Sequence, residues 1–255
     1  MALLSKTLMS LSAAALFSSL AFSQPALALD EAQKKEMGDF IKEYLISNPE
    51  VMLDVQAALE KKQEEQRLSQ SNKAISDNKD EIFNGKSDVN IGNEKGDVTV
   101  VEFFDYNCGY CRHALADTDK LLKNDKNIRY VMKEFPILGP DSVAASRVSD
   151  AFRRLAPTKY AAFSHTLLSS EGRATEDSAI EVAGTLGVKE DALRKEMAAN
   201  PNTDSIKATY QLATDLGVTG TPAYVIGDEA VSGAIGLDAL TEKVANVRAC
   251  GKTSC

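Results

Sequence analysis

The sequence lacks an excess of positive charge. Its 255 residues include 29 Lys and Arg against 37 Asp and Glu, which gives a formal net charge of −8 at pH 7. An acidic surface of this kind repels the phosphate backbone, so nucleic acid is excluded as a partner. The hydrophobic content of 44% is ordinary for a globular protein, and a chain of this length buries a sizeable core without disulfide staples.

The sequence also lacks any long hydrophobic run beyond its first residues. Lys6 precedes a 15-residue apolar stretch at 8–22, and residues 26–28 follow with the small-x-small pattern at which signal peptides are cleaved. The stretch is shorter than the roughly 20 residues of a membrane-spanning helix, which argues against an anchor. No cysteine near the cleavage point is available to take a lipid. We therefore predict a signal peptide at residues 1–28 and export of the mature protein.

Cysteine is scarce, and the four cysteines form two local pairs. Cys108 and Cys111 are three residues apart, and Cys250 and Cys255 lie at the end of the chain. Outside the cytoplasm unpaired thiols do not persist, and an even number of cysteines agrees with export. Pairing between sequence neighbours is the simplest scheme, although sequence alone does not determine connectivity.

Residues 29–84 are rich in Glu, Lys and Gln and predict a helical arm of two helices. Two apolar stripes repeat at helical spacing, and a Ser-Asn-Pro-Glu break at 47–50 separates them. Residues 61–67 are polar all round, as in a solvated stalk. An amphipathic arm buries its stripe either on its own domain or on another copy. Because the stalk separates the stripe from the domain, we expect a homo-oligomer formed through residues 30–68. The stripes consist of Met37, Phe40, Ile41, Tyr44, Leu45, Val51, Met52, Val55 and Leu59.

Residues 85–255 predict an α/β domain. The order is strand, helix, strand, then two paired strands and a final helix, which is the thioredoxin fold. Residues 141–217 contain no convincing strand and predict an inserted helical domain of four or five helices. The fold class is therefore a thioredoxin fold with a helical insertion, preceded by the helical arm. Strands are expected at 89–91, 98–104, 128–135, 223–226 and 230–232, with helices at 108–122 and 237–247.

Cys108 lies where a buried strand meets a helix. The free N–H groups and partial positive charge of a helix N-terminus favour a thiolate there, helped by Arg112 and His113. Cys111 follows about one turn later, close enough to Cys108 for the two to form a disulfide. A stabilised thiolate makes the disulfide more oxidising, so we predict an intermediate to oxidising couple.

A metal site is the competing interpretation of the Cys108/Cys111 pair. Two cysteines at this spacing form half of a zinc or copper(I) site, and Cys250 and Cys255 would supply the other half. His113 lies about 200° round the helix from Cys111 and cannot converge with both sulfurs. We therefore favour redox chemistry and predict no metal and no cofactor.

The run from Gly96 to Cys111, with Lys133-Glu134-Phe135-Pro136 and Thr219-Gly220-Thr221-Pro222-Ala223, resembles the DsbA family of periplasmic oxidoreductases. With the arm included, the chain is most similar to the suppressor-of-copper-sensitivity C (ScsC) branch, whose members oligomerise through an N-terminal arm. The motifs cover about 88–250, and the arm match is looser. The resemblance implies a periplasmic protein that acts on exported proteins with thiols or disulfides. It also implies a membrane redox partner of the DsbD or DsbB type.

The resemblance also implies roles for particular residues. Cys108 corresponds to the exposed nucleophile and Cys111 to the buried resolving thiol. Glu102 corresponds to the buried acid that relays a proton to Cys111, with an ordinary strand-end carboxylate as the alternative. Pro222 corresponds to a cis-proline beside the cysteines, which lets Thr221 pair with an extended substrate peptide. The alternative for Pro222 is a proline that merely begins a strand.

The dipeptide between the cysteines distinguishes two activities. Oxidants of this family most often have Pro-His there, whereas Gly109 and Tyr110, together with Thr221 before the proline, resemble the isomerases. We therefore favour a disulfide isomerase, with Gly109 and Tyr110 near the substrate. The alternatives are a DsbA-like dithiol oxidant, a periplasmic copper- or zinc-binding protein, and a holdase-like module built on the arm.

Two features remain outside this chemistry. Cys250 and Cys255 are expected to close a small tail loop as a structural disulfide, with a second redox relay as the alternative. His165 lies in the helical insertion, and the sequence indicates no partner for it.

Overall fold

A computed structural model describes residues 30–85 and 87–255. The predicted signal peptide, residues 1–28, lies outside this range. The chain divides into two compact units, and the boundary in the sequence falls between Leu59 and Glu60. Within the described ranges, no helix is both long and apolar enough to cross a membrane.

The first unit contains helix α1 (Glu31–Ser47) and the beginning of helix α2 (Glu50–Asp77). Asp30 begins α1 with a reciprocal cap. Its carboxylate accepts from the Gln33 backbone N–H at 2.8 Å, and the Gln33 side chain accepts from the Asp30 N–H at 3.1 Å. The predicted stripe is largely solvent-exposed, from 47% to 66% for Met37, Phe40, Ile41, Tyr44, Met52, Val55 and Leu59.

The second unit is built on one mixed sheet of five strands in the order β1-β3-β2-β4-β5. β2 and β3 are parallel, and the other neighbouring strands are antiparallel. The strands are β1 (Val89–Gly92), β2 (Val98–Phe104), β3 (Ile128–Glu134), β4 (Ala223–Ile226) and β5 (Glu229–Ser232). Their order, together with the helices that connect them, is the predicted thioredoxin fold.

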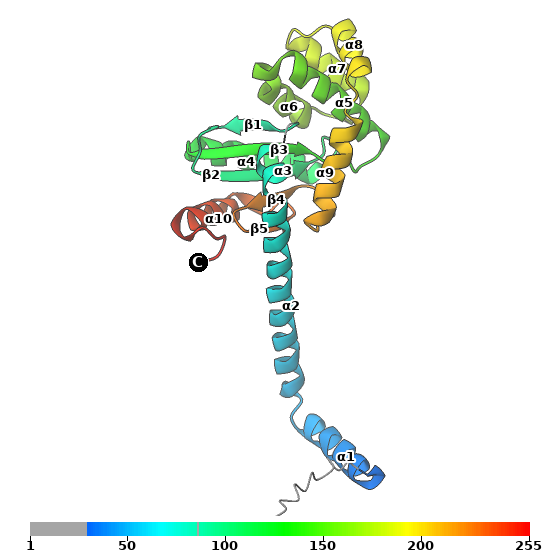
Figure 1. Ribbon diagram of the computed structural model, residues 1–255, viewed down its shortest axis with the longest axis vertical. Coiled ribbons are helices and arrows are strands. Elements are labelled where there is room, and N and C mark those ends of the chain that lie inside the picture. The colour runs from blue at the N-terminus through cyan, green and yellow to red at the C-terminus, as the bar shows by residue number, and fades with distance from the viewer. Residues whose placement is uncertain (1–29, 86) are drawn as a thin grey trace, which may run out of the picture. The chain divides into compact units, whose positions relative to one another are not determined.

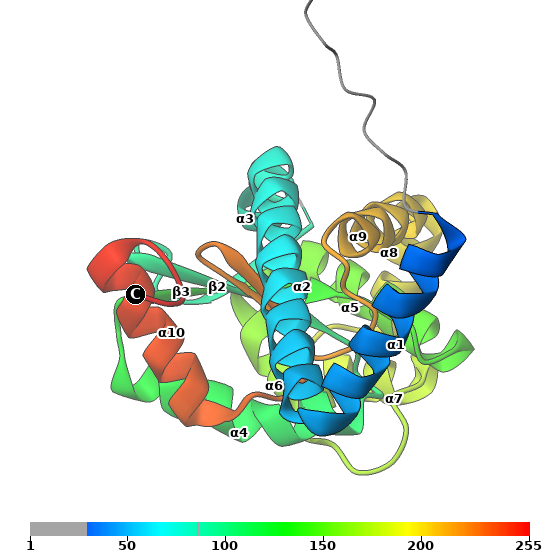
Figure 2. The same cartoon turned by 90° about the horizontal axis from the view of Figure 1, so that it is seen from below.

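The two faces of the sheet support separate cores because successive strand residues point to opposite sides. Val100 and Phe104 of β2 join one core with helices α4 (Gly109–Asn124) and α10 (Gly236–Cys250). These two helices lie side by side (Figure 2). Val101 and Phe103 point the other way, into a core with helices α3 (Lys79–Asn84) and α9 (Thr203–Asp215).

The helical insertion follows β3 and gathers beyond the β1 edge of the sheet (Figure 1). Its side chains share the α4 core, including Phe152, Phe163 and Leu167. α9 belongs to the predicted insertion by sequence, but it packs on the opposite face of the sheet through Leu212 and Ala213. The helices of the insertion are α5 (Pro140–Leu155), a 3-10 turn (Pro157–Lys159), α6 (Tyr160–Ser169), α7 (Glu176–Thr185) and α8 (Glu190–Ala199).

The predicted arm contains three helices rather than two, and its last part belongs to the second unit. Ile75 at the end of α2 and Ile82 of α3 are buried in the α9 core. Ser71 accepts a hydrogen bond from the Ala230 N–H of β5 at 3.2 Å. The helical pattern in the sequence therefore does not show where the exposed arm ends and the second unit begins. That boundary depends on which residues contact the sheet and are buried.

Replacing Ile82 with alanine should destabilise the second unit by about 2 to 5 kcal/mol, the usual cost of such a truncation in a core. Ile82 is fully buried. Urea denaturation followed by circular dichroism measures the change. Leu155→Ala is the control, because Leu155 is 41% exposed and its truncation should cost far less. Equal stabilities for the two variants would contradict the assignment of α3 to the core.

Candidate active site

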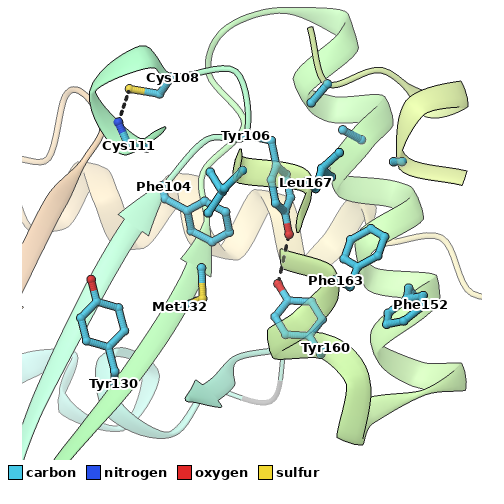
Figure 3. Packing of buried hydrophobic residues seen from close by; sticks show 14 of the residues in the cluster. Phe104, Tyr106, Cys108, Cys111, Tyr130, Met132, Phe152, Tyr160, Phe163 and Leu167 are labelled. Carbon is cyan, nitrogen blue, oxygen red and sulfur yellow. Dashed lines mark hydrogen bonds between the residues drawn. The ribbon is translucent and has the colours of Figure 1, made fainter. Parts of the chain in front are cut away.

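Cys108 is the N-cap residue of α4, directly after the turn that ends β2. The turn is held by Asp105, whose carboxylate accepts from the Asn107 N–H at 2.8 Å and whose carbonyl accepts from the Cys108 N–H at 3.0 Å. The Cys108 Sγ accepts a hydrogen bond from the Cys111 N–H at 3.4 Å (Figure 3). The sulfur therefore lies at the positive end of the helix dipole, where a thiolate is stabilised.

Both sulfurs of the pair are free thiols in this structure, and both are buried. Cys108 is 5% exposed and Cys111 is 1% exposed. The expected exposure of Cys108 is thus not seen, because the loop before β4 lies against it. The Cys108 Sγ donates to the Thr221 carbonyl oxygen at 3.1 Å. Burial, reinforced by the charge of Glu102, raises the pKa of Cys111 well above that of an ordinary thiol.

The Thr221–Pro222 peptide bond is cis. β4 begins at the next residue, Ala223, so the loop that faces Cys108 is anchored directly in the sheet. The Thr221 hydroxyl is buried and has no hydrogen-bond partner. Tyr110, two residues after Cys108 in the chain, is 72% exposed. The structure thus puts Thr221 in contact with Cys108 and leaves the Tyr110 ring open to solvent.

Glu102 lies on the same face of β2 as the α4 core, since it is two residues from both Val100 and Phe104. It is 5% exposed, and burial raises its pKa to about 7. The Tyr130 hydroxyl donates to it at 2.6 Å. Figure 3 shows this hydroxyl directed toward the end of the sheet where Cys108 and Cys111 lie. A buried carboxyl near neutrality is suited to proton transfer.

Two polar side chains, Asn107 and Arg112, bind the segment around Cys108 to the insertion, a role that the sequence did not indicate for either. Asn107 donates to the Ala174 carbonyl at 2.9 Å and accepts from its N–H at 2.8 Å. Arg112 donates to the Tyr106 carbonyl at 3.0 Å and to the Gly172 carbonyl at 2.7 Å. Arg112, predicted to help the thiolate, is therefore engaged with backbone oxygens.

A second acid, the partly buried Glu134 at the end of β3, binds side chains next to the cysteine loop. It accepts hydrogen bonds from the Tyr160 hydroxyl at 2.8 Å, from Tyr106 at 3.2 Å and from Ser149. Burial raises the pKa of Glu134. Tyr106 and Tyr160 meet in Figure 3. The sequence identified Glu134 only as part of a matching motif, because its partners come from helices far along the chain.

Cys250 and Cys255 form a disulfide with their Cα atoms 6.2 Å apart. Thr253 between them is buried and contacts Asp228 and Glu229 of the β4–β5 hairpin. The tail therefore packs on the sheet as a closed loop. Its sulfurs are not available as thiolates to complete a metal site with Cys108 and Cys111. In the described part of the chain, no three His, Cys, Asp or Glu side chains converge as metal ligands do.

Two protein-family models match the chain. The DSBA-like thioredoxin domain matches residues 99–245, and the copper resistance protein ScsC N-terminal domain matches residues 33–66. The first covers more than half of the chain and includes Glu102, both cysteines of the Cys108/Cys111 pair and Pro222. The second lies within the predicted arm.

Solved structures agree with these matches. A thioredoxin-like oxidoreductase from Silicibacter pomeroyi is 39% identical, with 68% of this chain and 99% of that chain covered and a TM-score of 0.64. The thiol-disulfide exchange protein α-DsbA2 from Wolbachia pipientis is 34% identical, with 71% and 97% covered and a TM-score of 0.66. A linker-deletion mutant of Proteus mirabilis ScsC is 26% identical, with 88% and 99% covered and a TM-score of 0.63.

Curated proteins match over a shorter part of their length. The Na(+)/H(+) antiporter NhaA 1 of Salinispora arenicola is 26% identical over 153 residues, which are 60% of this chain and 24% of the antiporter. The chain thus spans about a quarter of the length of the curated relatives that it matches. With the thioredoxin fold, the cysteine pair at the start of α4 and the family match over residues 99–245 in agreement, the chain belongs to the DsbA-like thioredoxin family.

Proposed function

We propose that this protein is a periplasmic thiol:disulfide oxidoreductase that forms or rearranges disulfide bonds in exported proteins. The observation that carries the proposal is the position of the Cys108 sulfur. It lies at the N-terminus of α4, bonded to the Cys111 N–H and facing the Thr221 carbonyl. A thiolate stabilised in this way is a nucleophile and also a good leaving group, as thiol-disulfide exchange requires.

The exchange proceeds in two steps. The Cys108 thiolate attacks one sulfur of a substrate disulfide, which forms a mixed disulfide and releases the other substrate sulfur as a thiolate. Cys111 then loses its proton to Glu102 and attacks the Cys108 sulfur. This step forms the Cys108–Cys111 disulfide and releases the second substrate thiolate, which takes up a proton. The same steps in reverse transfer a disulfide to a reduced substrate.

Substrate binding is assigned to the residues around Cys108. The backbone of Thr221, next to Pro222, would pair with an extended peptide as an added strand does. Gly109 has no side chain, and a Cβ atom built on it would meet nothing within 4 Å, so a peptide can approach the helix start closely. The exposed Tyr110 ring offers an apolar contact.

Isomerisation is the favoured activity, with dithiol oxidation as the alternative. The Gly-Tyr dipeptide supports it, and so does the arm, whose exposed stripe would join copies through residues 30–68. An oligomer presents several active sites to one misfolded substrate, which raises the effective concentration for repeated attack. An isomerase needs a DsbD-type partner that keeps Cys108 reduced, whereas an oxidant needs a DsbB-type partner that reoxidises the pair.

Two substitutions in the full chain, Phe40→Asp and Tyr44→Asp, test this activity. The two rings stack 6.3 Å apart and are 66% and 48% exposed. We expect the double variant to run as a monomer by light scattering. It should oxidise reduced substrate normally and refold a scrambled multi-disulfide substrate about tenfold more slowly, because a monomer loses multivalent attack.

Lys42→Asp is the control, since it changes the net charge by the same two units at an exposed position of the same helix. This variant should keep the wild-type mass and activity. An unchanged mass in the Phe40/Tyr44 double variant would refute the role of the arm. A wild-type protein that oxidises reduced substrate but does not unscramble it would instead establish the dithiol oxidant.

A further inference from the structure

A cavity of about 130 Å³ connects the buried side chains of the active site with the protein surface. Glu102 and Cys111 both line it, and so do Asp119 of α4 and His165 of α6. The side chains of Asp119 and His165 are 54% and 50% exposed. The cavity therefore reaches from a buried acid and a buried thiol to side chains in contact with bulk solvent.

Several polar side chains line the wall of the cavity. The Tyr130 hydroxyl bonds both Glu102, at 2.6 Å, and the Thr118 hydroxyl, at 3.1 Å. Ser164 of α6 lines the cavity as well. One ordered water needs roughly 10 to 15 Å³ and two to four polar partners. The volume is large enough for more than one water, and Glu102, the Tyr130 and Thr118 hydroxyls and Ser164 are polar partners for them on a wall that is otherwise largely apolar.

The histidine at the outer end of the cavity has a defined partner. His165 Nε2 lies 3.0 Å from Asp119 Oδ2, so two helices that are distant in sequence hold the imidazole in place. Histidine is the side chain whose proton uptake and release fall nearest to physiological pH. A carboxylate bonded to one ring nitrogen orients the ring and leaves its other nitrogen to exchange protons.

The two tyrosines nearest Glu102 are not suited to exchange protons with solvent. Tyr130 bonds it directly, and Tyr224 faces it across the β2–β4 register. Burial and the nearby carboxylate raise the pKa of both tyrosines above the ordinary range. The remaining acidic groups near Tyr224 are Asp117 on α4 and the two active-site thiols. Of these groups, Cys111 itself must give up a proton during each turnover.

We propose that the cavity is a water-filled proton path and that His165, positioned by Asp119, exchanges protons between this path and bulk solvent. This inference rests on the proposed role of Glu102 as proton acceptor for Cys111. When a mixed disulfide is resolved, the Cys111 proton passes to Glu102, then through the cavity waters to His165 and out. The Cys111 thiolate left behind attacks Cys108 and displaces the substrate thiolate. In the reverse reaction the proton travels inward. His165 is thus a positioning and relay residue that does not touch the substrate.

The test follows the resolution step alone. Reduced full-length protein is mixed with glutathione disulfide, samples are quenched with acid, and the Cys108–glutathione mixed disulfide is counted by mass spectrometry from pH 6 to pH 8. We expect His165→Ala to slow decay of the mixed disulfide about tenfold at pH 7, while iodoacetamide alkylates Cys108 at the wild-type rate. Added imidazole should restore the decay rate, because it replaces the missing relay.

Two further variants make the result specific. Thr166→Ala is the matched control, since Thr166 follows His165 on α6, is exposed and does not line the cavity. It should resolve at the wild-type rate. Ala161→Leu puts a larger side chain into the cavity near His165. It should slow resolution, and imidazole should not restore the rate because the path itself is narrowed. Wild-type resolution by His165→Ala, or slow resolution that imidazole does not relieve, would overturn the proton path.

Glu102→Gln separates this inference from the function on which it rests. If Glu102→Gln resolves slowly while His165→Ala resolves at the wild-type rate, only the path is wrong. If Glu102→Gln itself resolves at the wild-type rate, the assignment of Glu102 as proton acceptor is wrong, whatever His165→Ala does.

Discussion

Replacing Cys108 with serine should lower the rate of thiol-disulfide exchange by at least about a thousandfold. The serine hydroxyl fits the same helix cap, but it is not ionised near neutral pH and forms no disulfide. The N-terminus of α4 would therefore keep its hydrogen bond while losing its nucleophile. Reduction of insulin by dithiothreitol, and oxidation of a dithiol peptide, both measure the loss.

Matched cysteine variants show whether the loss belongs to Cys108 itself. Cys111→Ser should keep Cys108 reactive toward iodoacetamide and accumulate mixed disulfides, because the resolving thiol is gone. Loss of the tail disulfide in a Cys250→Ser/Cys255→Ser variant should leave exchange intact, since the tail packs on the β4–β5 hairpin. Substantial exchange by Cys108→Ser would show that the chemistry lies elsewhere.

Glu102→Gln should stabilise the reduced protein by about 3 to 4 kcal/mol at pH 8 and by almost nothing at pH 4. Burial raises the pKa of Glu102 from the ordinary 4.5 to about 7. Below pH 4.5 the carboxyl is protonated in both states and imposes no penalty. As the pH rises to 7, the unfolded chain releases this proton more readily than the folded chain, so wild-type stability falls. Each unit of raised pKa corresponds to about 1.4 kcal/mol.

Urea denaturation of the reduced protein between pH 4 and pH 8 tests this difference. Asp88 and Glu134 also have pKa values raised by burial, so the informative quantity is the difference between variant and wild type. Glu94→Gln is the control, because Glu94 lies exposed in the turn before β2. It should follow the wild-type curve at every pH. A Glu102→Gln curve parallel to that of wild type would mean that Glu102 is not held in a desolvated site.

Local patterns were sufficient to predict the strands of the sheet and the position of the cysteine pair. β2 and β4 begin and end where the apolar runs do, at 98–104 and 223–226. Cys108 begins α4 because a buried strand, a short turn and an amphipathic helix follow one another directly. The cis bond before Pro222 came from a family resemblance, since a single Gly-Thr-Pro sequence is compatible with several backbone conformations.

The packing of helices onto the sheet was beyond the reach of those patterns. The sequence pattern of α9 predicts one more helix of the insertion, yet Leu212 and Ala213 pack it on the opposite face of the sheet. The end of α2 reads as a continuation of the stalk, yet Ile75 is buried. An amphipathic pattern states that a helix has an apolar face, but it does not state which surface covers that face.

The sequence by itself indicated the residues that we propose carry the chemistry: two cysteines one helical turn apart after a buried strand, and an acid six positions before the first of them. Only the tertiary structure decided which distant side chains lie around those residues. It pairs His165 with Asp119 across 46 positions and brings both to the cavity that Glu102 lines. Periodicity and spacing act over a few residues, whereas proton paths and buried networks depend on contacts between segments that are far apart along the chain.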